Sequence, residues 1–114
     1  MKVEITVQKI GVGHLVVLKG DVDMNSSPDV RGSIAEVFKQ GPGAKALVID
    51  LSGVRYMDSS GIATLVEAMQ NCMKQGMKLR LAELSPSVRD VFELARLSSI
   101  FEIFPKASDA QAGL

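Results

Sequence analysis

Apolar and polar residues alternate strictly at the start of the chain and give way to longer apolar runs after it. The segment "MKVEITVQ" (1–8) has an apolar residue at almost every second position, which predicts a strand with one solvated face. The segment "HLVVLKG" (14–20) is mostly aliphatic and predicts a more buried strand. Because the glycine-rich turn "KIGVG" joins the two, they are expected to pair antiparallel, with the first strand at a sheet edge.

Helical periods and apolar strands alternate in the rest of the chain. Ser27 is expected to cap a helix that starts at Pro28 and stops at the "GPG" turn of residues 41–43. Gly32 inside this helix costs up to about 1 kcal/mol relative to alanine, which close packing against the sheet would explain. The apolar residues on one face of this helix are Val30, Ile34, Val37 and Phe38. The further expected elements are a strand at 44–51, a helix from about Ser60 to Lys74, a strand at 77–84, a helix beginning near 85–95 and a short strand at 100–104.

The order of these elements, ββαβαβαβ, defines the expected fold class. It predicts one α/β domain over residues 1–114, with a mixed sheet of about five strands and three main crossover helices. Only the first strand is expected to run antiparallel to its neighbour. The core is expected within residues 3–104, and the small polar residues of 105–114 predict a flexible tail that frays.

Charge and residue usage exclude several classes of function. Thirteen basic residues balance thirteen acidic ones without a dense basic cluster, so neither nucleic acid nor anionic lipid is an expected partner. The apolar runs are far shorter than the roughly 18 residues of a membrane span, and the chain starts without a secretion signal. A cytoplasmic protein without membrane insertion is therefore expected.

The single cysteine and the single histidine bear on metal sites and catalysis. Cys72 and His14 together form neither a disulfide nor a Cys/His metal site, so no metal and no cofactor is expected. Cys72 is expected to pack in the core, and His14 to be an exposed turn residue. The sequence also lacks the "GxSxG" and "GxxxxGK[ST]" motifs, so neither a hydrolase nor a nucleotide hydrolase is expected.

The segment "RYMDSSGIAT" (55–64) carries the candidate functional chemistry. A helix starting at "SSG" would turn one face to the core, comprising Ile62, Leu65, Val66, Met69, Cys72 and Met73. Its opposite, polar face would comprise Ser60, Thr64, Glu67, Asn71 and Lys74. By this projection Ser59 points inward and Ser60 points to solvent. Asp58 or Ser59 would cap the helix, whereas Gly61 is a poor helix former that instead allows a backbone or a ligand to approach closely.

A phosphate on Ser60 is the modification that this position favours. The free N–H groups and the dipole at a helix N-terminus would stabilise it without unfolding the domain. It would add about 1.5 to 2 negative charges beside Asp58 and, if the strand ends converge, beside Asp21 and Asp23. A partner that docks on this surface would then be repelled.

Three long segments carry a resemblance to a known family: "KGDVDMNSSPDVR", "ALVIDLSGVRYMDSSGIATLV" and "LRLAELSPSVRDVFELARLSSIFEIF". Together with the element order, residues 3–104 resemble a STAS domain of the anti-sigma factor antagonist type. The resemblance implies a non-enzymatic adaptor that binds an ATP-dependent serine kinase, which is also the anti-sigma factor. It makes Ser60 the phosphoacceptor of that kinase and implies a phosphatase that restores the serine.

The expected partner-binding surface follows from this resemblance and from the polar helix face. Its residues are Asp21, Asp23, Met24, Asn25, Ser26, Asp58, Ser59, Gly61 and Thr64. The chain departs mildly from the family, which often has threonine and alanine at Ser26 and Ser27 and glutamate at Asp21. These departures leave the identity of the partner open.

Other functions of the same fold stay open at this point. A STAS domain also serves as the cytoplasmic subunit of lipid-transporting ABC systems, where the same helix start docks on an ATPase. A nucleotide- or ligand-sensing domain and a purely structural module with capping serines are further alternatives. The chain is expected to be a monomer or a weak dimer, since a solvated first strand at a sheet edge offers a pairing surface.

Overall fold

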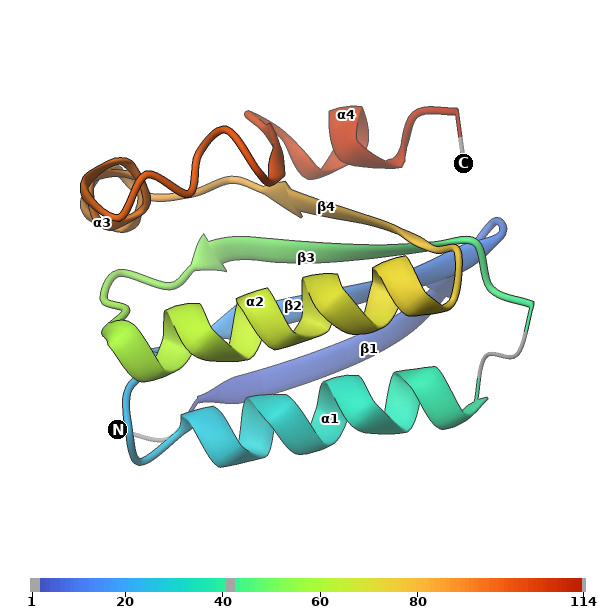
Figure 1. Ribbon diagram of the computed structural model, residues 1–114, viewed down its shortest axis with the longest axis horizontal. Helices are drawn as coiled ribbons and strands as arrows, with labels where there is room; N and C mark the ends of the chain where they lie inside the picture. Colours follow the sequence, from blue (N-terminus) through green and yellow to red (C-terminus); the bar gives the residue numbers. More distant parts are fainter. Residues whose placement is uncertain (1–2, 41–42, 114) are drawn as a thin grey trace.

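A computed structural model describes residues 3–40 and 43–113 and contains one five-stranded sheet, in which the strands follow their order along the chain (Figure 1). The elements are β1 (Glu4–Ile10), β2 (Gly13–Lys19), α1 (Ser27–Gln40), β3 (Ala46–Gly53), α2 (Ser59–Lys74), β4 (Lys78–Ala82), α3 (Pro86–Leu94), β5 (Glu102–Phe104) and α4 (Ala107–Gln111). Only β1 and β2 pair antiparallel, and all other neighbours are parallel. The predicted ββαβαβαβ order and mixed sheet are confirmed, with α4 as an additional element.

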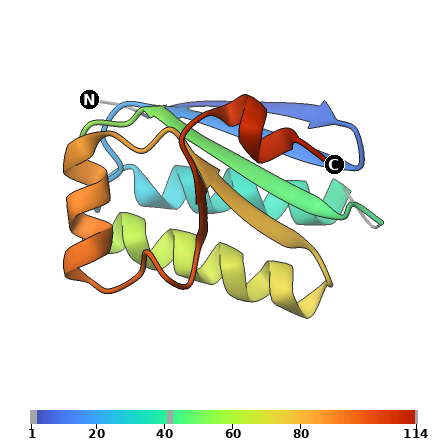
Figure 2. The same cartoon turned by 90° about the horizontal axis from the view of Figure 1, so that it is seen from above.

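The sequential strand order explains the arrangement of the helices. Each crossover from β2 onward adds its strand on the same side, and crossovers are almost always right-handed, so α1 and α2 must cover the same face of the sheet. Figure 2 shows these two helices against one face, α3 across one end of the sheet, and α4 on the opposite face. The main core therefore lies between the sheet and the first three helices.

The main core uses the apolar positions that the sequence pattern indicates. In α1, the side chains of Val30, Ile34 and Val37 are buried, as predicted. Both β2 and β3 are buried along most of their length, as expected for strands with neighbours on both sides. The predicted stop of α1 at residues 41 and 42 lies outside the described residues. Gly32 is not packed against the sheet as expected, because a Cβ there would meet no atom within 4 Å.

A second, smaller core corrects the prediction of a flexible tail. Residues 107–111 form α4, whose buried Ala110 packs on the far face of the sheet. Arg80 of β4 holds this helix, because its Nη1 donates to the backbone oxygens of Ala110 (3.0 Å) and Ala112 (3.1 Å). The residues of the small core are Leu15, Val48, Ala82 and Ala110. The tail was predicted to fray because its residues are small and polar, and that pattern does not reveal the hydrogen bonds from Arg80.

The predictions for the single cysteine and the single histidine of the chain have different outcomes. Cys72 is buried in the main core, which confirms the packing role predicted for it. His14 was predicted to be an exposed turn residue, but only 9% of it is exposed. His14 lies in β2, within the predicted strand, and it is buried because it stands on the sheet face that the helices cover.

Candidate functional site

The loops that follow β2 and β3 meet at the start of α2. Val22 and Met57 form an isolated parallel bridge, in which the Val22 N–H donates to the oxygen of Tyr56 (3.0 Å) and the Asp58 N–H donates to the oxygen of Val22 (3.2 Å). A Cβ on Gly61 would lie 2.8 Å from that same Val22 oxygen. The close backbone approach that the glycine predicted is therefore present. Convergence of the two loops follows from the parallel pairing, which brings the carboxyl ends of β2 and β3 to one edge.

Asp58 is the N-cap of α2. Its Oδ1 accepts from the backbone N–H groups of Ser60 (2.9 Å) and Gly61 (3.2 Å) and from the Ser60 hydroxyl (2.5 Å). Its Oδ2 accepts from the N–H of Met24 (3.2 Å), which ties the loop after β2 to the helix start. The hydrogen bond from the Ser60 hydroxyl, above all, lowers the pKa of Asp58, with partial burial opposing and the three N–H groups assisting. The carboxylate is therefore held in its charged form.

The hydroxyl of Ser60 also contacts a serine from another helix. Its Oγ lies 3.0 Å from the Oγ of Ser27, the first residue of α1. Ser27 donates its own proton to the backbone oxygen of Asp23 (2.6 Å), while Ser60 donates to Asp58. Each hydroxyl has one proton, so two protons are available for three oxygen–oxygen contacts. A hydrogen bond between Ser27 and Ser60 therefore requires that one of the two hydroxyls shares its proton or gives up its other acceptor. Sequence reasoning missed Ser27, which was predicted only to cap α1.

The loop between β2 and α1 is shaped by Asp23 and Ser26. The Oδ1 of Asp23 accepts from the N–H groups of Asn25 (2.9 Å) and Ser26 (3.0 Å), an arrangement typical of an Asx turn. Ser26 is buried, and its hydroxyl accepts from the Asp23 N–H and donates to the oxygen of Asp21. Ser26 therefore braces the loop from inside, and 75% of the Met24 side chain is left exposed beside it.

The predicted orientation of α2 requires correction. Ser59 was expected to point inward and Ser60 to solvent, but Ser59 is exposed and Ser60 is half-buried against α1. Thr64, predicted on the polar surface, is only 2% exposed and donates its hydroxyl proton to the Ser60 backbone oxygen. Conversely, Met73 was placed in the core but is 72% exposed.

The physical reason is that α2 packs against two neighbours at once. It contacts α1 on one side and the sheet on another, so the centre of its buried face is rotated toward α1 (Figure 1). The buried residues of α2 are Gly61, Thr64, Leu65, Ala68 and Cys72. A helical projection that assumes a single apolar face cannot locate this second contact.

Three of the N–H groups at the start of α2 already have acceptors. Those of Ser60 and Gly61 donate to the Asp58 side chain, and that of Ile62 donates to the Asp58 backbone oxygen. The expectation of free N–H groups is therefore not met at these three residues while Asp58 caps the helix. A phosphate on Ser60 would instead meet the carboxylate of Asp58.

The expected partner-binding residues fall into two groups. Those with accessible side chains are Asp21, Asp23, Met24, Asn25, Asp58 and Ser59, which are exposed or half-buried. Those buried beneath the surface are Ser26, Gly61 and Thr64. Tyr56, which sequence reasoning did not select, is exposed in the loop that leads into α2. These three buried residues hold the site in place, and a partner cannot contact their side chains.

Within 3–40 and 43–113, no three His, Cys, Asp or Glu side chains are grouped so that they could hold a metal ion. No helix of the described chain has the length and the apolar character needed to cross a membrane.

Comparison with known proteins assigns this chain to a family. The family model described as "STAS domain" matches residues 4–110. The anti-sigma-B factor antagonist of Listeria monocytogenes is 32% identical over 104 residues, which are 90% of each chain. This chain belongs to the STAS domain family, among the anti-sigma factor antagonists. The site described above lies in two of the three segments that carried the resemblance, the first and the second.

Solved structures agree with this STAS fold. A crystal structure of an anti-sigma factor antagonist from Mycobacterium paratuberculosis superposes with a TM-score of 0.82 at 28% identity, covering 95% of this chain and 90% of that one. The Bacillus cell fate determinant SpoIIAA in its phosphorylated form superposes with a TM-score of 0.73, covering 94% of this chain and 96% of that one. At 19% identity, the second likeness bears on the fold alone.

Proposed function

We propose that this STAS domain is a non-enzymatic adaptor that binds an anti-sigma factor serine kinase, and that phosphorylation of Ser60 releases it. The observation that carries the proposal is the Ser60 hydroxyl, which is held by Asp58 and Ser27 at the start of α2 and lies next to an exposed loop. That loop presents Met24 and Asn25, and its backbone is fixed from beneath by Ser26 and Asp58. A rigid surface of this kind suits a protein partner, because little ordering is required on binding.

The switch rests on the charge of the site. The Ser60 Oγ lies 2.5 Å from a carboxylate oxygen of Asp58 whose charged form is favoured. A phosphate on this oxygen has to turn outward, toward the surface where the partner docks, because like charges repel at this distance. There it adds about 1.5 to 2 negative charges beside Asp23, and a loss of about 3 kcal/mol would already weaken binding more than a hundredfold.

The chemistry of phosphate transfer is assigned to the partner. Asp58 contacts the hydroxyl, but the lowered pKa of its carboxyl makes it a weak base. The kinase therefore supplies the ATP, the magnesium ions and the catalytic base, and a separate phosphatase reverses the modification. Support comes from the name of a relative, since the Listeria protein is an anti-sigma-B factor antagonist. A cytoplasmic location fits these partners.

The test compares Ser60 with its exposed neighbour Ser59. The variants Ser60→Ala, Ser60→Asp, Ser59→Ala and Ser59→Asp are measured for binding to the cognate anti-sigma factor by calorimetry. Phosphopeptide mass spectrometry then locates any phosphate after incubation with that factor and ATP. We expect phosphate on Ser60, retained binding of Ser60→Ala and a loss of at least about a hundredfold for Ser60→Asp.

Other outcomes would assign the same surface differently. Phosphate on Ser59, or equal binding of Ser60→Asp and wild type, contradicts the switch. Capture of an ABC transporter ATPase by the unmodified protein, with no phosphate on Ser60 under any growth condition, would favour the role of a transporter subunit.

A further inference from the structure

The hydroxyl group of Ser27 has a second contact that its own loop does not require. Its side chain is only 2% exposed, and burial of a hydroxyl costs free energy unless the group is hydrogen-bonded. The backbone oxygen of Asp23 accepts from this hydroxyl (2.6 Å), but it also accepts from the Ser27 N–H (2.8 Å). Ser27→Ala would therefore leave the Asp23 oxygen bonded. What the hydroxyl adds is the contact with Ser60, at 3.0 Å between the two Oγ atoms.

The neighbours of the two hydroxyls decide which of them donates in this contact. The Ser60 Oγ lies 2.5 Å from the Asp58 carboxylate, and a hydrogen bond to a charged acceptor is about twice as strong as a neutral one. Ser60 therefore keeps its proton on Asp58. The Asp23 oxygen already has the Ser27 N–H, so it loses little when the Ser27 hydroxyl shares its proton. Ser27 is thus the donor, and the Ser60 oxygen is the acceptor.

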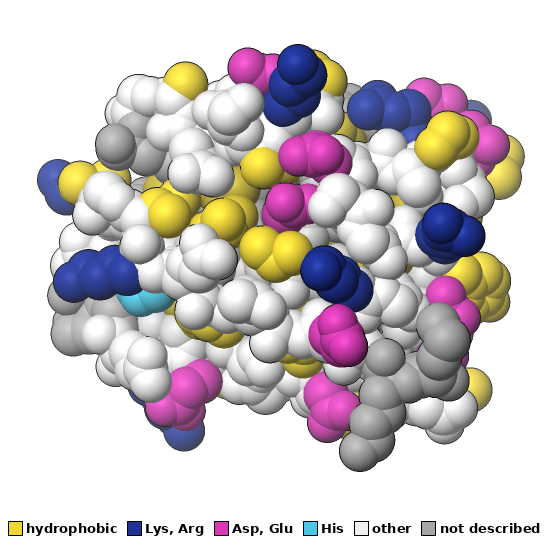
Figure 3. All heavy atoms as spheres, turned by 180° about the vertical axis from the view of Figure 1, so that it is seen from behind, with side chains coloured by type: hydrophobic (Ala, Val, Ile, Leu, Met, Phe, Trp, Pro, Cys, Tyr) yellow, Lys and Arg dark blue, Asp and Glu magenta, His cyan; other side chains and the backbone are white. Residues whose placement is uncertain are grey.

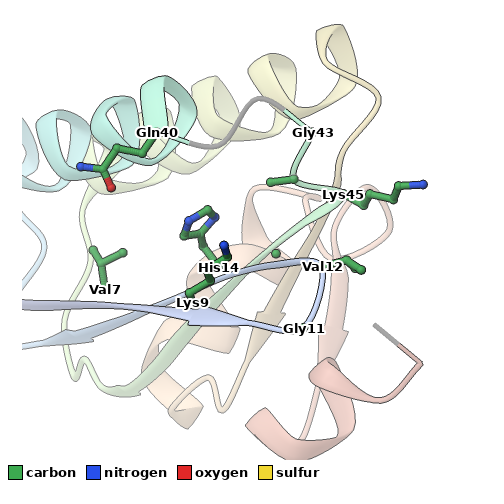
Figure 4. A pocket seen from close by; sticks show the side chains of 10 residues that line it. Val7, Lys9, Gly11, Val12, His14, Gln40, Gly43 and Lys45 are labelled. Atoms are coloured by element: carbon green, nitrogen blue, oxygen red, sulfur yellow. The ribbon is translucent and has the colours of Figure 1, made fainter.

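The donor lies at the start of a well-packed helix. α1 runs from Ser27 to Gln40, which lies beside the β1–β2 hairpin at the other end of the sheet (Figure 4). The apolar residues buried along its length are Val30, Ile34 and Val37. Because this packing holds the Ser27 oxygen in place, the contact is made or broken by the rotamer of Ser60.

Phosphate transfer requires the Ser60 oxygen to leave this position. In the transfer, the Oγ forms a bond to the γ-phosphorus of ATP as the bond from that phosphorus to ADP breaks, and the hydroxyl proton passes to the base of the kinase. The oxygen has to come within about 3–3.5 Å of the phosphorus. In the observed rotamer it is turned toward Ser27, which is buried at the junction of α1 and α2. Rotation about the Cα–Cβ bond of Ser60 exposes the oxygen and breaks the contact with Ser27.

Local contacts rather than a long-range field control this rotation. The formal charges of the chain sum to zero, and acidic and basic side chains are intermingled on the face of the molecule that Figure 3 shows. Such a distribution produces little net field to orient an approaching kinase. The hydrogen bonds of Ser60 with Asp58 and Ser27 therefore determine how often its oxygen points outward.

We propose that Ser27 is a positioning residue that holds the Ser60 hydroxyl inward and thereby slows its phosphorylation. The role rests on the proposed function, because it concerns phosphate transfer to the same serine. Loss of this one hydrogen bond should raise the outward population, and with it the rate of transfer, about three- to tenfold. Docking should not change, because Ser27 is buried and a partner cannot contact its side chain.

The experiment compares Ser27→Ala with Ser33→Ala, which removes a half-buried hydroxyl about 9 Å further along α1. Each protein is saturated with the cognate anti-sigma factor, and single-turnover phosphorylation by ATP then measures the transfer rate apart from docking. Calorimetry without ATP measures the affinity. NMR of the free protein, through the Hα–Hβ couplings of Ser60, reports the rotamer of this serine without any kinase.

Ser27→Ala is expected to accelerate transfer about three- to tenfold at unchanged affinity and to shift the Ser60 couplings toward a second rotamer. Ser33→Ala should match wild type in each measurement. A merely structural role of Ser27 would change the free energy of unfolding and leave the transfer rate of the bound protein unchanged.

Two kinds of failure can be told apart. Phosphate on Ser60 at equal rates in wild type and Ser27→Ala, or unchanged Ser60 couplings in Ser27→Ala, would overturn the role of Ser27 and leave the proposed function standing. Absence of phosphate from Ser60 of the wild-type protein would overturn the proposed function, and the role of Ser27 with it.

Discussion

At the scale of single residues, the carboxylate of Asp58 organises the functional site. It accepts four hydrogen bonds, three from backbone N–H groups and one from a hydroxyl, and so fixes the start of α2, the position of Met24 and the rotamer of Ser60 together. The sequence left the cap of α2 to either Asp58 or Ser59, because both are common N-cap residues, and the structure assigns it to Asp58. The bond to Met24 does not follow from the sequence, because the two residues are 34 positions apart.

Replacement of Asp58 is expected to reveal this role through its pH dependence. Because the folded protein lowers the pKa of this carboxyl below 3.8, its stabilisation is fully present above that value and is lost as the pH falls through the folded-state pKa. Asp58→Asn should lower the free energy of unfolding by about 1 kcal/mol at neutral pH, and the gap to wild type should close in acid. Urea unfolding between neutral pH and pH 3 measures this gap. Asp90→Asn, on an exposed position of α3, is the control. A gap that does not change with pH would contradict the assignment.

Two helical glycines give an opposite pair of predictions. A Cβ on Gly61 would lie 2.6 Å from Met57 Cγ and 2.8 Å from the Val22 oxygen, whereas a Cβ on Gly32 would meet nothing within 4 Å. Gly61→Ala should therefore lower the free energy of unfolding by about 1–3 kcal/mol, despite the better helix propensity of alanine. Gly32→Ala should raise it by up to about 1 kcal/mol. Equal signs for the two changes in urea unfolding would contradict this explanation.

At the scale of elements, topology distributes the helices unequally over the sheet. The sequential strand order brings α1 and α2 to one face, so the opposite face would be left largely open. The short helix α4 covers part of that face, over Leu15, Val48 and Ala82. It has a single buried residue, Ala110, and depends on Arg80 for its attachment.

The contribution of α4 can be measured with two matched substitutions. Ala110→Glu places a carboxylate in the small core and should detach the helix, which would lower the free energy of unfolding by about 1–3 kcal/mol. Ala112→Glu introduces the same side chain at an exposed position after the helix and should change stability little. Urea unfolding and the amide hydrogen exchange of residues 107–111 provide the measurements. Equal stability of the two variants would show that α4 does not stabilise the fold.

At the scale of the whole molecule, one continuous core joins the two ends of the sheet. The proposed phosphorylation site lies at one end of the sheet, and Cys72 lies inside the core. Burial raises the pKa of the Cys72 thiol to about 12, so the reactive thiolate is scarce in the folded protein. The thiol is therefore a probe of how the domain opens.

Labelling of Cys72 by a disulfide reagent is expected to be slow in the native protein and fast in denaturant. If the core opens as a unit, Gly61→Ala should accelerate labelling by the factor that corresponds to its loss of unfolding free energy. The reference is the chemical denaturation of the same variant, and Gly32→Ala should slow labelling in proportion. Rapid labelling of the native protein, or labelling insensitive to both variants, would instead mean that α2 opens locally.

The sequence by itself determined the order of elements, the antiparallel start of the sheet, the apolar face of α1 and a cap of α2 at either Asp58 or Ser59. These features depend on the local hydrophobic period and on the residues that begin and end a helix, and both are set by residues close together in the chain. Only the tertiary structure decided that α2 turns Ser60 and Thr64 toward α1, that His14 lies inside and that residues 107–111 form a helix. Two of these depend on a neighbour from a distant part of the chain, α1 for α2 and Arg80 for α4. His14 lies inside because it stands on the sheet face that the helices cover. The hydrophobic period of a sequence identifies one buried face of a helix or strand. It carries no information on where a second neighbour packs against that element.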